Sequence, residues 1–151
     1  MSFSDIAALI GKGLVAGAVG TAAMTVSSNV EMKLRDRSAS SAPADAAAKV
    51  LGLDFADEQD KERFGTAVHW GYGTGWGAVR GVLAALGLRG VGATGVHLGL
   101  LWGSEIVLLP ALDVAPPITD WEPEEVAIDA LHHVVYAVVT AMTFELLDRR
   151  S

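Results

Sequence analysis

Ionisable side chains inside otherwise apolar stretches are the residues of this sequence that could carry chemistry. Asp129 precedes His132 by three positions and His133 by four, so one face of a helix would present a carboxylate and an imidazole together. Oxygen and nitrogen ligands of this kind suit Zn, Fe or Mn. The same groups can also exchange protons, because histidine titrates near neutral pH and neighbouring carboxylates shift that titration.

Four long apolar stretches must position these side chains. They cover residues 6–32, 64–88, 91–112 and 126–147. Each is long enough to cross a bilayer core, which takes about 20 residues of helix. Hydrophobic residues make up 51% of the chain and charged residues 19%, whereas a soluble bundle, the alternative, would carry a charged face on every helix. We therefore predict an all-α fold, a four-transmembrane-helix bundle that forms a single membrane domain over residues 1–151.

The long connection between the first two stretches predicts one further helix. In "SAPADAAAKVLG", Pro43 suits the first helical turn, Asp45 follows it, and Gly52 suits the position after the helix end. The apolar residues of this segment are Val50, Leu51, Leu53 and Phe55. We expect a short amphipathic helix that lies along the membrane surface.

Composition and context exclude several classes of function. The chain has no cysteine, which removes disulfides and thiolate chemistry. Its formal net charge of -7 argues against nucleic acid as a partner. The "GVGATG" run at 90–95 matches a nucleotide-binding fingerprint, but it joins two apolar helices instead of following a strand, so we expect no nucleotide. The expected partners are the lipid bilayer and either further copies of the chain or a larger membrane complex.

Glycines recur every four residues in the apolar stretches, a spacing that places them on one helix face. The rows are Gly13 and Gly17; Gly73, Gly77 and Gly81; and Gly95, Gly99 and Gly103. Small residues in such rows let helix backbones approach closely. Gly71 and Gly75 fall on another face of the second stretch, which predicts that this helix packs tightly against two neighbours.

The depth of the polar residues predicts a cluster. If the four helices alternate in direction, six ionisable residues belong near the membrane face that carries the two long loops, and Arg80 and His97 belong nearer the other face. The six are Glu31, His69, Glu105, Asp129, His132 and His133. Secondary polar positions are Arg37, Arg80, His97, Asp120 and Tyr136.

Three functions are compatible with such a cluster. The leading hypothesis is a non-enzymatic membrane protein, a pH- or stress-responsive channel-like or accessory component in which the cluster responds to protons. The first alternative is an embedded Zn, Fe or Mn site, or less readily a haem, with redox or hydrolytic chemistry; the Asp129–His133 spacing supplies half of a dimetal-bundle pattern. The second alternative is a structural polar core within a larger complex.

The run "LPALDVAPPITDWEPEEVAIDALHHVVYAV" (109–138) resembles the YagU-like inner-membrane proteins, a family of unknown biochemical function. The matching positions are Pro110, Pro116, Pro117, Asp120, Asp129 and His133, with Glu31, Arg37 and His69 earlier in the chain. The resemblance implies a multi-pass protein of the inner (plasma) membrane with cytoplasmic termini. The distribution of Lys and Arg leans the other way, and we adopt the orientation that the resemblance implies.

Two positions depart from the family pattern. Family members can carry histidine where this chain has Glu105, and they lack His132. A fixed set of ligands built on these two residues is therefore not implied by the resemblance.

Overall fold

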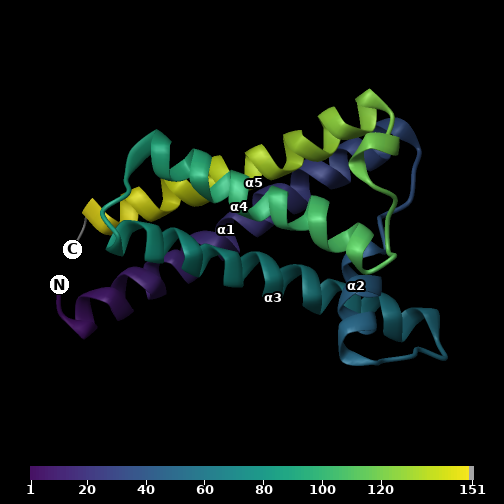
Figure 1. Ribbon diagram of the computed structural model, residues 1–151, viewed down its shortest axis with the longest axis horizontal. Coiled ribbons are helices and arrows are strands. Elements are labelled where there is room, and N and C mark those ends of the chain that lie inside the picture. The colour runs from purple at the N-terminus through teal and green to yellow at the C-terminus, as the bar shows by residue number, and fades with distance from the viewer. Residues whose placement is uncertain (150–151) are drawn as a thin grey trace.

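The computed structural model describes residues 1–149 and is helical throughout its regular elements (Figure 1). The long helices are α1 (Phe3–Arg35), α3 (Glu58–Ala85), α4 (Gly90–Ala111) and α5 (Pro123–Arg149). The short α2 (Ala42–Leu51) and a 3₁₀ turn, η1 (Ile118–Asp120), lie in the two long connections. No strand occurs among the described residues. The all-α prediction is confirmed, including a short helix in the first loop.

Local capping extends α1 and α3 beyond the apolar stretches. Ser2 and Asp5 form a capping box at the start of α1. Asp57 caps α3 by accepting a hydrogen bond from the backbone N–H of Gln59, and Glu58 and Asp60 occupy its first turn. Acidic residues there are stabilised by the helix dipole, so the polar run before position 64 is helical instead of being part of the loop.

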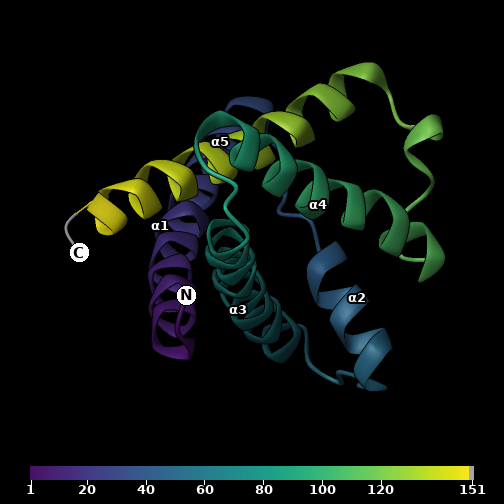
Figure 2. The same cartoon turned by 60° about the vertical axis from the view of Figure 1, so that its left-hand side comes forward.

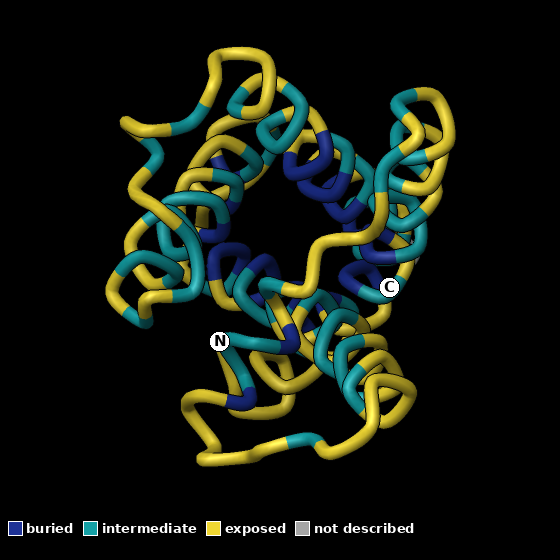
Figure 3. The backbone as a smooth tube through the Cα atoms, turned by 90° about the vertical axis from the view of Figure 1, so that its right-hand side faces the viewer, coloured by how far each residue is buried: buried dark blue, intermediate teal, exposed yellow. Residues whose placement is uncertain are grey.

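The long helices alternate in direction, and the two ends of the bundle differ (Figures 1 and 2). Both termini and the tight 86–89 turn lie at one end, here called the terminal end; α2, the 112–122 loop and the last turns of α1 lie at the other, the loop end. Gly87 in the tight turn and Gly90 at the start of α4 have positive φ, a conformation that favours glycine. Viewed along the bundle, the buried segments of the helices face inward (Figure 3).

Glycines bring α1 and α3 into close backbone contact, as their spacing predicts. A Cβ on Gly17 would lie 2.7 Å from the Cα of Gly77, and one on Gly81 would lie 2.8 Å from the Cα of Ile10. Real Cβ atoms do not approach other atoms so closely, so any larger residue at these positions would push the two helices apart. These helices pack along each other more extensively than any other pair of elements.

Two of the predicted glycine faces have no packing partner within the described chain. A Cβ on Gly95, Gly99 or Gly103 would meet nothing within 4 Å, and the same holds for Gly71 and Gly75. Helix α4 buries a different face against the bundle, consisting of Ala93, His97 and Leu101. Its glycine row therefore lies against no described part of the chain, and α3 packs tightly on one glycine face instead of two.

Three of the long helices, α1, α4 and α5, are long and apolar enough to cross a membrane. They expose apolar side chains to the surroundings, such as Val26 (63%), Val107 (66%) and Met142 (62%). The predicted span in α3 falls short, because its middle consists largely of glycine and aromatic residues, with His69 and Arg80 among them. The prediction of four spans thus holds for three helices by length and composition.

Helix α2 packs against the start of α3. Ala44 and Ala48 are its buried residues, and Phe55, just beyond the helix, packs against Phe64 with ring centroids 5.0 Å apart. Lys61 Nζ lies 2.7 Å from Asp45 Oδ1. This ammonium group, with the Ser41 hydroxyl, lowers the pKa of the Asp45 carboxyl.

Candidate functional site

His133 on α5 is almost fully buried, and its ring is held at both nitrogens. Nε2 lies 2.7 Å from Oε2 of Glu105 on α4, with the imidazole side chain 3% exposed. Nδ1 lies 2.8 Å from the backbone carbonyl oxygen of Asp129, one turn earlier on α5. A carbonyl can only accept a hydrogen bond. Nδ1 must therefore carry a proton and donate it to Asp129.

That assignment fixes what lies between His133 and Glu105. With Nδ1 protonated, a neutral imidazole would present a bare acceptor at Nε2 to the Glu105 carboxylate, which also only accepts. Two acceptors do not form a stable contact of 2.7 Å. One proton therefore lies in this contact, either on Nε2 of a charged imidazole or on the carboxyl group of Glu105.

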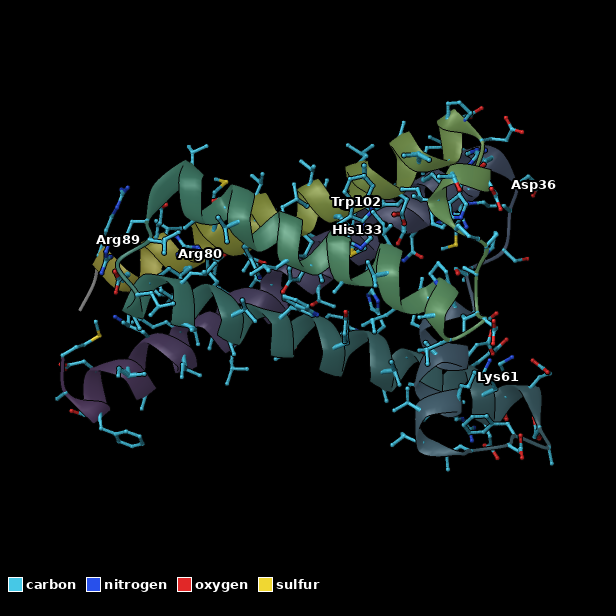
Figure 4. All side chains as sticks on the ribbon, viewed as in Figure 1. Asp36, Lys61, Arg80, Arg89, Trp102 and His133 are labelled. Carbon is cyan, nitrogen blue, oxygen red and sulfur yellow. The ribbon has the colours of Figure 1, made fainter. Side chains whose placement is uncertain are left out.

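Trp102 joins Asp129 to α4 and completes this network. Its Nε1 donates a hydrogen bond of 2.7 Å to Asp129 Oδ2. The same carboxylate oxygen lies 3.6 Å from His133 Nδ1. Trp102 and His133 lie side by side between α4 and α5 in Figure 4. We call Trp102, Glu105, Asp129 and His133 the proton network. Trp102 was absent from the sequence-based set, although it lies three positions before Glu105 and so shares its helix face.

His132 and Glu31 belong to a second network at the end of α1. His132 Nδ1 lies 2.9 Å from Ser27 Oγ, and His132 Nε2 lies 3.8 Å from Glu31 Oε2. Glu31 accepts hydrogen bonds from Arg37, at 2.7 Å from Nε and 2.5 Å from Nη2, and one of 3.2 Å from Arg35 Nη1. Its carboxylate is therefore fully engaged by guanidinium groups.

The six predicted residues thus do not form one cluster. They divide between the proton network, the second network at the end of α1, and His69, which belongs to neither. His69 Nε2 lies 2.9 Å from Thr25 Oγ1, and no Asp or Glu oxygen within the described chain comes within 4.0 Å of its ring nitrogens. Adjacent helix residues point about 100° apart, so His132 faces α1 while His133 faces α4. All six residues do lie in the half of their helix that is nearer the loop end.

The secondary positions lie apart from the proton network. His97 is buried and its Nε2 lies 2.9 Å from the carbonyl oxygen of Trp76. Tyr136 donates to the carbonyl oxygen of Gly73 at 2.5 Å. Asp120 is exposed in η1. Arg80 is buried toward the terminal end.

A small cavity adjoins the proton network on the side of the 112–122 loop. Its volume is about 30 Å³, and it is lined by Glu105, Asp129, Pro110, Pro116, Ile118 and Trp121, among others. Trp121 Nε1 donates to the carbonyl oxygen of Pro116 at 2.9 Å, which closes the loop over the cavity. Such a space can hold a water molecule where polar groups line it. Both carboxylates of the network line this cavity.

The geometry does not assemble a metal centre. Among residues 1–149, no group of three or more His, Asp or Glu side chains is arranged to hold a metal ion. In the proton network the carboxylates of Glu105 and Asp129 lie at opposite edges of the His133 ring, so their oxygens do not converge on one point. Glu31, the third acid, is bound by Arg35 and Arg37.

No known family model, curated protein or solved structure matches this chain. Its function is therefore inferred from the geometry of the site.

Proposed function

We propose that the chain is a proton-responsive membrane protein in which the contact between Glu105 and His133 is the switch. The observation that carries this proposal is the buried Nε2–Oε2 distance of 2.7 Å, which requires a proton between two titratable groups on different helices. Because this bond and the Trp102–Asp129 bond both connect α4 to α5, protonation controls the packing of these helices at the loop end.

The direction of the switch follows from the charges. With one shared proton the pair has no net charge and forms a charge-assisted hydrogen bond. A second proton leaves a carboxylic acid facing an imidazolium, so the buried positive charge loses its carboxylate partner at Nε2, which is costly in an apolar interior. Acidification therefore separates α4 from α5 at the loop end and admits water through the cavity beside Glu105 and Asp129.

Other titratable groups surround the pair. Asp129 and His132 lie on α5 itself. Helix α3 contributes His69, which interacts electrostatically with Glu105, and Tyr72, whose hydroxyl lies 3.5 Å from Ser104 Oγ on α4. Helix α1 contributes Glu31, which faces His132. The Glu31 carboxylate is neutralised by two arginines, so Asp129 is the remaining acid that can offset a second proton.

We further propose that α3 is a fourth membrane span. Helix α3 lies along α1 with backbone contacts at Gly13, Gly17, Gly77 and Gly81, and α1 is long and apolar enough to cross a membrane. A helix packed along a spanning helix over this length occupies the same depth. The polar and glycine residues of α3 are tolerated because neighbouring helices cover them.

On the resemblance of residues 109–138, we propose that the protein belongs with the YagU-like inner-membrane proteins and has cytoplasmic termini. A metal centre and a purely structural core are the competing readings. The experiments below distinguish both of them from the switch.

A distance measurement tests the switch. The chain has no cysteine, so cysteines can be introduced for spin labelling. Leu108→Cys and Leu131→Cys are suitable sites, because both side chains are about half exposed near the loop end of α4 and α5. The distance between the two labels, measured in nanodiscs, reports the separation of these helices. Between about pH 8 and pH 4, which spans the ordinary range of imidazole and carboxyl groups, we expect the separation to increase.

Glu105→Gln is the decisive variant in the same experiment. A glutamine amide can donate to Nε2 without any shared proton, so this variant should keep the paired distance at every pH. Glu58→Gln, which removes an exposed acid from the start of α3, should behave as the unsubstituted protein. A separation that ignores pH, or that changes equally in Glu105→Gln, would contradict the proposal.

A further inference from the structure

A second feature, at the terminal end of the bundle, is independent of the proton network. A recess of about 220 Å³ opens between the end of α3, the start of α4 and the end of α5. It is lined by Arg80, Arg89, Phe144, Glu145, Asp148 and Arg149, together with Gly90. Arg80 and Arg89 lie at this end in Figure 4, far from His133.

Arg80 forms one wall of the recess, and its charge is incompletely paired. The side chain is 1% exposed, and its Nε and Nη1 atoms have no hydrogen-bond partner among the described residues. The nearest carboxylate oxygen, on Glu145, lies 3.8 Å from Nη2, and the guanidinium carbon lies 4.6 Å from the centre of the Phe144 ring. A buried guanidinium is normally paired and hydrogen-bonded. This one lacks acceptors.

The remaining charged residues of the recess do not supply hydrogen-bond acceptors for Arg80. Asp148 is bound by Lys12 at 3.0 Å and by Arg89 at 2.5 Å. Glu145 also faces Arg149, at 3.8 Å. Around this recess the described chain therefore sets four cationic side chains against two carboxylates. The surplus is positive and includes the buried group.

The start of α4 adds backbone donors to the same wall. Arg89 is the N-cap residue of α4 and makes no side-chain capping bond. Gly90, the first residue of the helix, lines the recess and has no side chain to block access to the backbone. The free N–H groups and the helix dipole at such a terminus favour an anion.

We propose that this recess binds a phosphate group through Arg80, Arg89 and the N-terminus of α4. Guanidinium groups bind phosphate oxygens through charge-assisted hydrogen bonds, and the negative charge of a phosphate would offset the incompletely paired charge of Arg80. Helix ends such as Arg89 and Arg149 lie at the depth of lipid headgroups in a bundle that spans the bilayer. A lipid headgroup and free phosphate share this chemistry, and the experiment separates them.

Three titrations of the delipidated full-length protein test the proposal. Native mass spectrometry counts bound phosphatidylglycerol in the first and bound phosphatidylcholine, the lipid without net charge, in the second. In the third titration, inorganic phosphate is added and the thermal unfolding temperature of the protein is measured. The variants are Arg80→Gln and Arg89→Gln, and the matched control is Arg63→Gln, an arginine that is 71% exposed at the opposite end of α3.

Phosphatidylglycerol should bind in preference to phosphatidylcholine. Each recess variant should weaken the binding of phosphatidylglycerol about tenfold, because one charge-assisted contact is lost. Arg63→Gln should have no effect. If Arg80→Gln does not fold, Arg89→Gln carries the test, because that side chain is 62% exposed. Stabilisation by inorganic phosphate that both recess variants remove would identify a free-anion site; an effect confined to the lipid would identify a headgroup site. Binding that is absent, or equal in all variants, would overturn the proposal.

Discussion

At the scale of single residues, His133 differs from the other histidines of the chain. Both of its nitrogens lie within hydrogen-bond distance of an oxygen, a backbone carbonyl at Nδ1 and a carboxylate at Nε2, whereas His132 Nε2 lies 3.8 Å from its nearest carboxylate oxygen. His97 has a partner at Nε2 only, and its buried Nδ1 has none within the described residues. The second contact of His133 crosses to another helix, so a change in its proton affects packing and not only local charge.

Trp102→Phe tests whether Trp102 stabilises the proton network around His133. The substitution keeps an aromatic ring but removes the hydrogen bond to Asp129. We expect a loss of about 1 kcal/mol in unfolding free energy, because a hydrogen bond to a partly exposed charged group is lost. Chemical unfolding in detergent measures it. Trp70→Phe, at a 40% exposed tryptophan on α3, is the control, and an equal loss in both variants would contradict the role of Trp102.

Metal analysis tests the competing hypothesis, a metal centre that includes His133. Because the ligand groups do not converge, purified protein should contain Zn, Fe and Mn well below one ion per chain. The variant to compare is His133→Ala. A metal present at one ion per chain and lost in this variant would replace the switch with a metal centre.

At the scale of helices, the sequence predicts which elements form better than which faces meet. Hydrophobic length predicted all four long helices, but glycine spacing marks a face without showing what lies opposite it. Gly77 and Gly99 belong to equivalent-looking rows, yet only Gly77 is pressed against another backbone. Tertiary packing decides between them, and it depends on the rotation of each helix about its axis.

Gly77→Ala and Gly99→Ala form a matched pair for this difference. A Cβ at position 77 would lie 2.6 Å from the Cα of Gly17, so α1 and α3 must separate. We expect a cost of about 1–3 kcal/mol, typical of overpacking. Gly99→Ala adds a methyl group in open space and should be neutral or stabilising by up to about 1 kcal/mol. Unfolding measurements that give similar values for both variants would contradict the observed packing.

The attachment of α2 to α3 should depend on pH. Because the Lys61 ion pair lowers the pKa of Asp45 below its usual value of 3.8, this pair stabilises the docked α2 above that pH, and the contribution is lost as the pH falls below it. Limited proteolysis of residues 36–57 should therefore accelerate in strong acid. Asp45→Asn should be cleaved faster already at neutral pH, whereas Asp54→Asn, at an exposed acid, should not. Equal cleavage of the two variants at neutral pH would count against the role of the ion pair.

At the scale of the whole molecule, the two ends of the bundle carry different chemistry. The two networks of histidine and carboxylate side chains lie toward the loop end, and a recess that contains three arginines lies at the terminal end. The position of the first group followed from the sequence, because alternating helix directions place Glu31, Glu105 and Asp129 at one depth. The division of this group into two networks could not be predicted from the sequence, because it depends on which neighbouring helix each face of α5 contacts. The recess was not predicted, because Arg80, Arg89 and Arg149 come from three helix ends.

Labelling with a membrane-impermeant maleimide tests the four-span topology. Single cysteines at Ser2, Asp57, Leu86 and Asp113 probe the N-terminus and the three connections in turn. If all four long helices cross the bilayer, positions 2 and 86 lie on one side, and positions 57 and 113 on the other. Position 86 on the same side as position 57 would show that α3 does not cross.

The proton between Glu105 and His133 is the centre of the account, and nitrogen NMR of the histidine rings observes it directly. The experiment uses ¹⁵N-histidine-labelled protein in nanodiscs between about pH 4 and pH 8, with His133→Gln to assign the signal. We predict that Nδ1 of His133 is protonated at neutral pH, that the Nε2 signal changes over this range, and that Glu105→Gln holds the ring as the neutral Nδ1–H form throughout. A His133 signal that is independent of pH, or that is the same in Glu105→Gln as in the unsubstituted protein, would contradict the account.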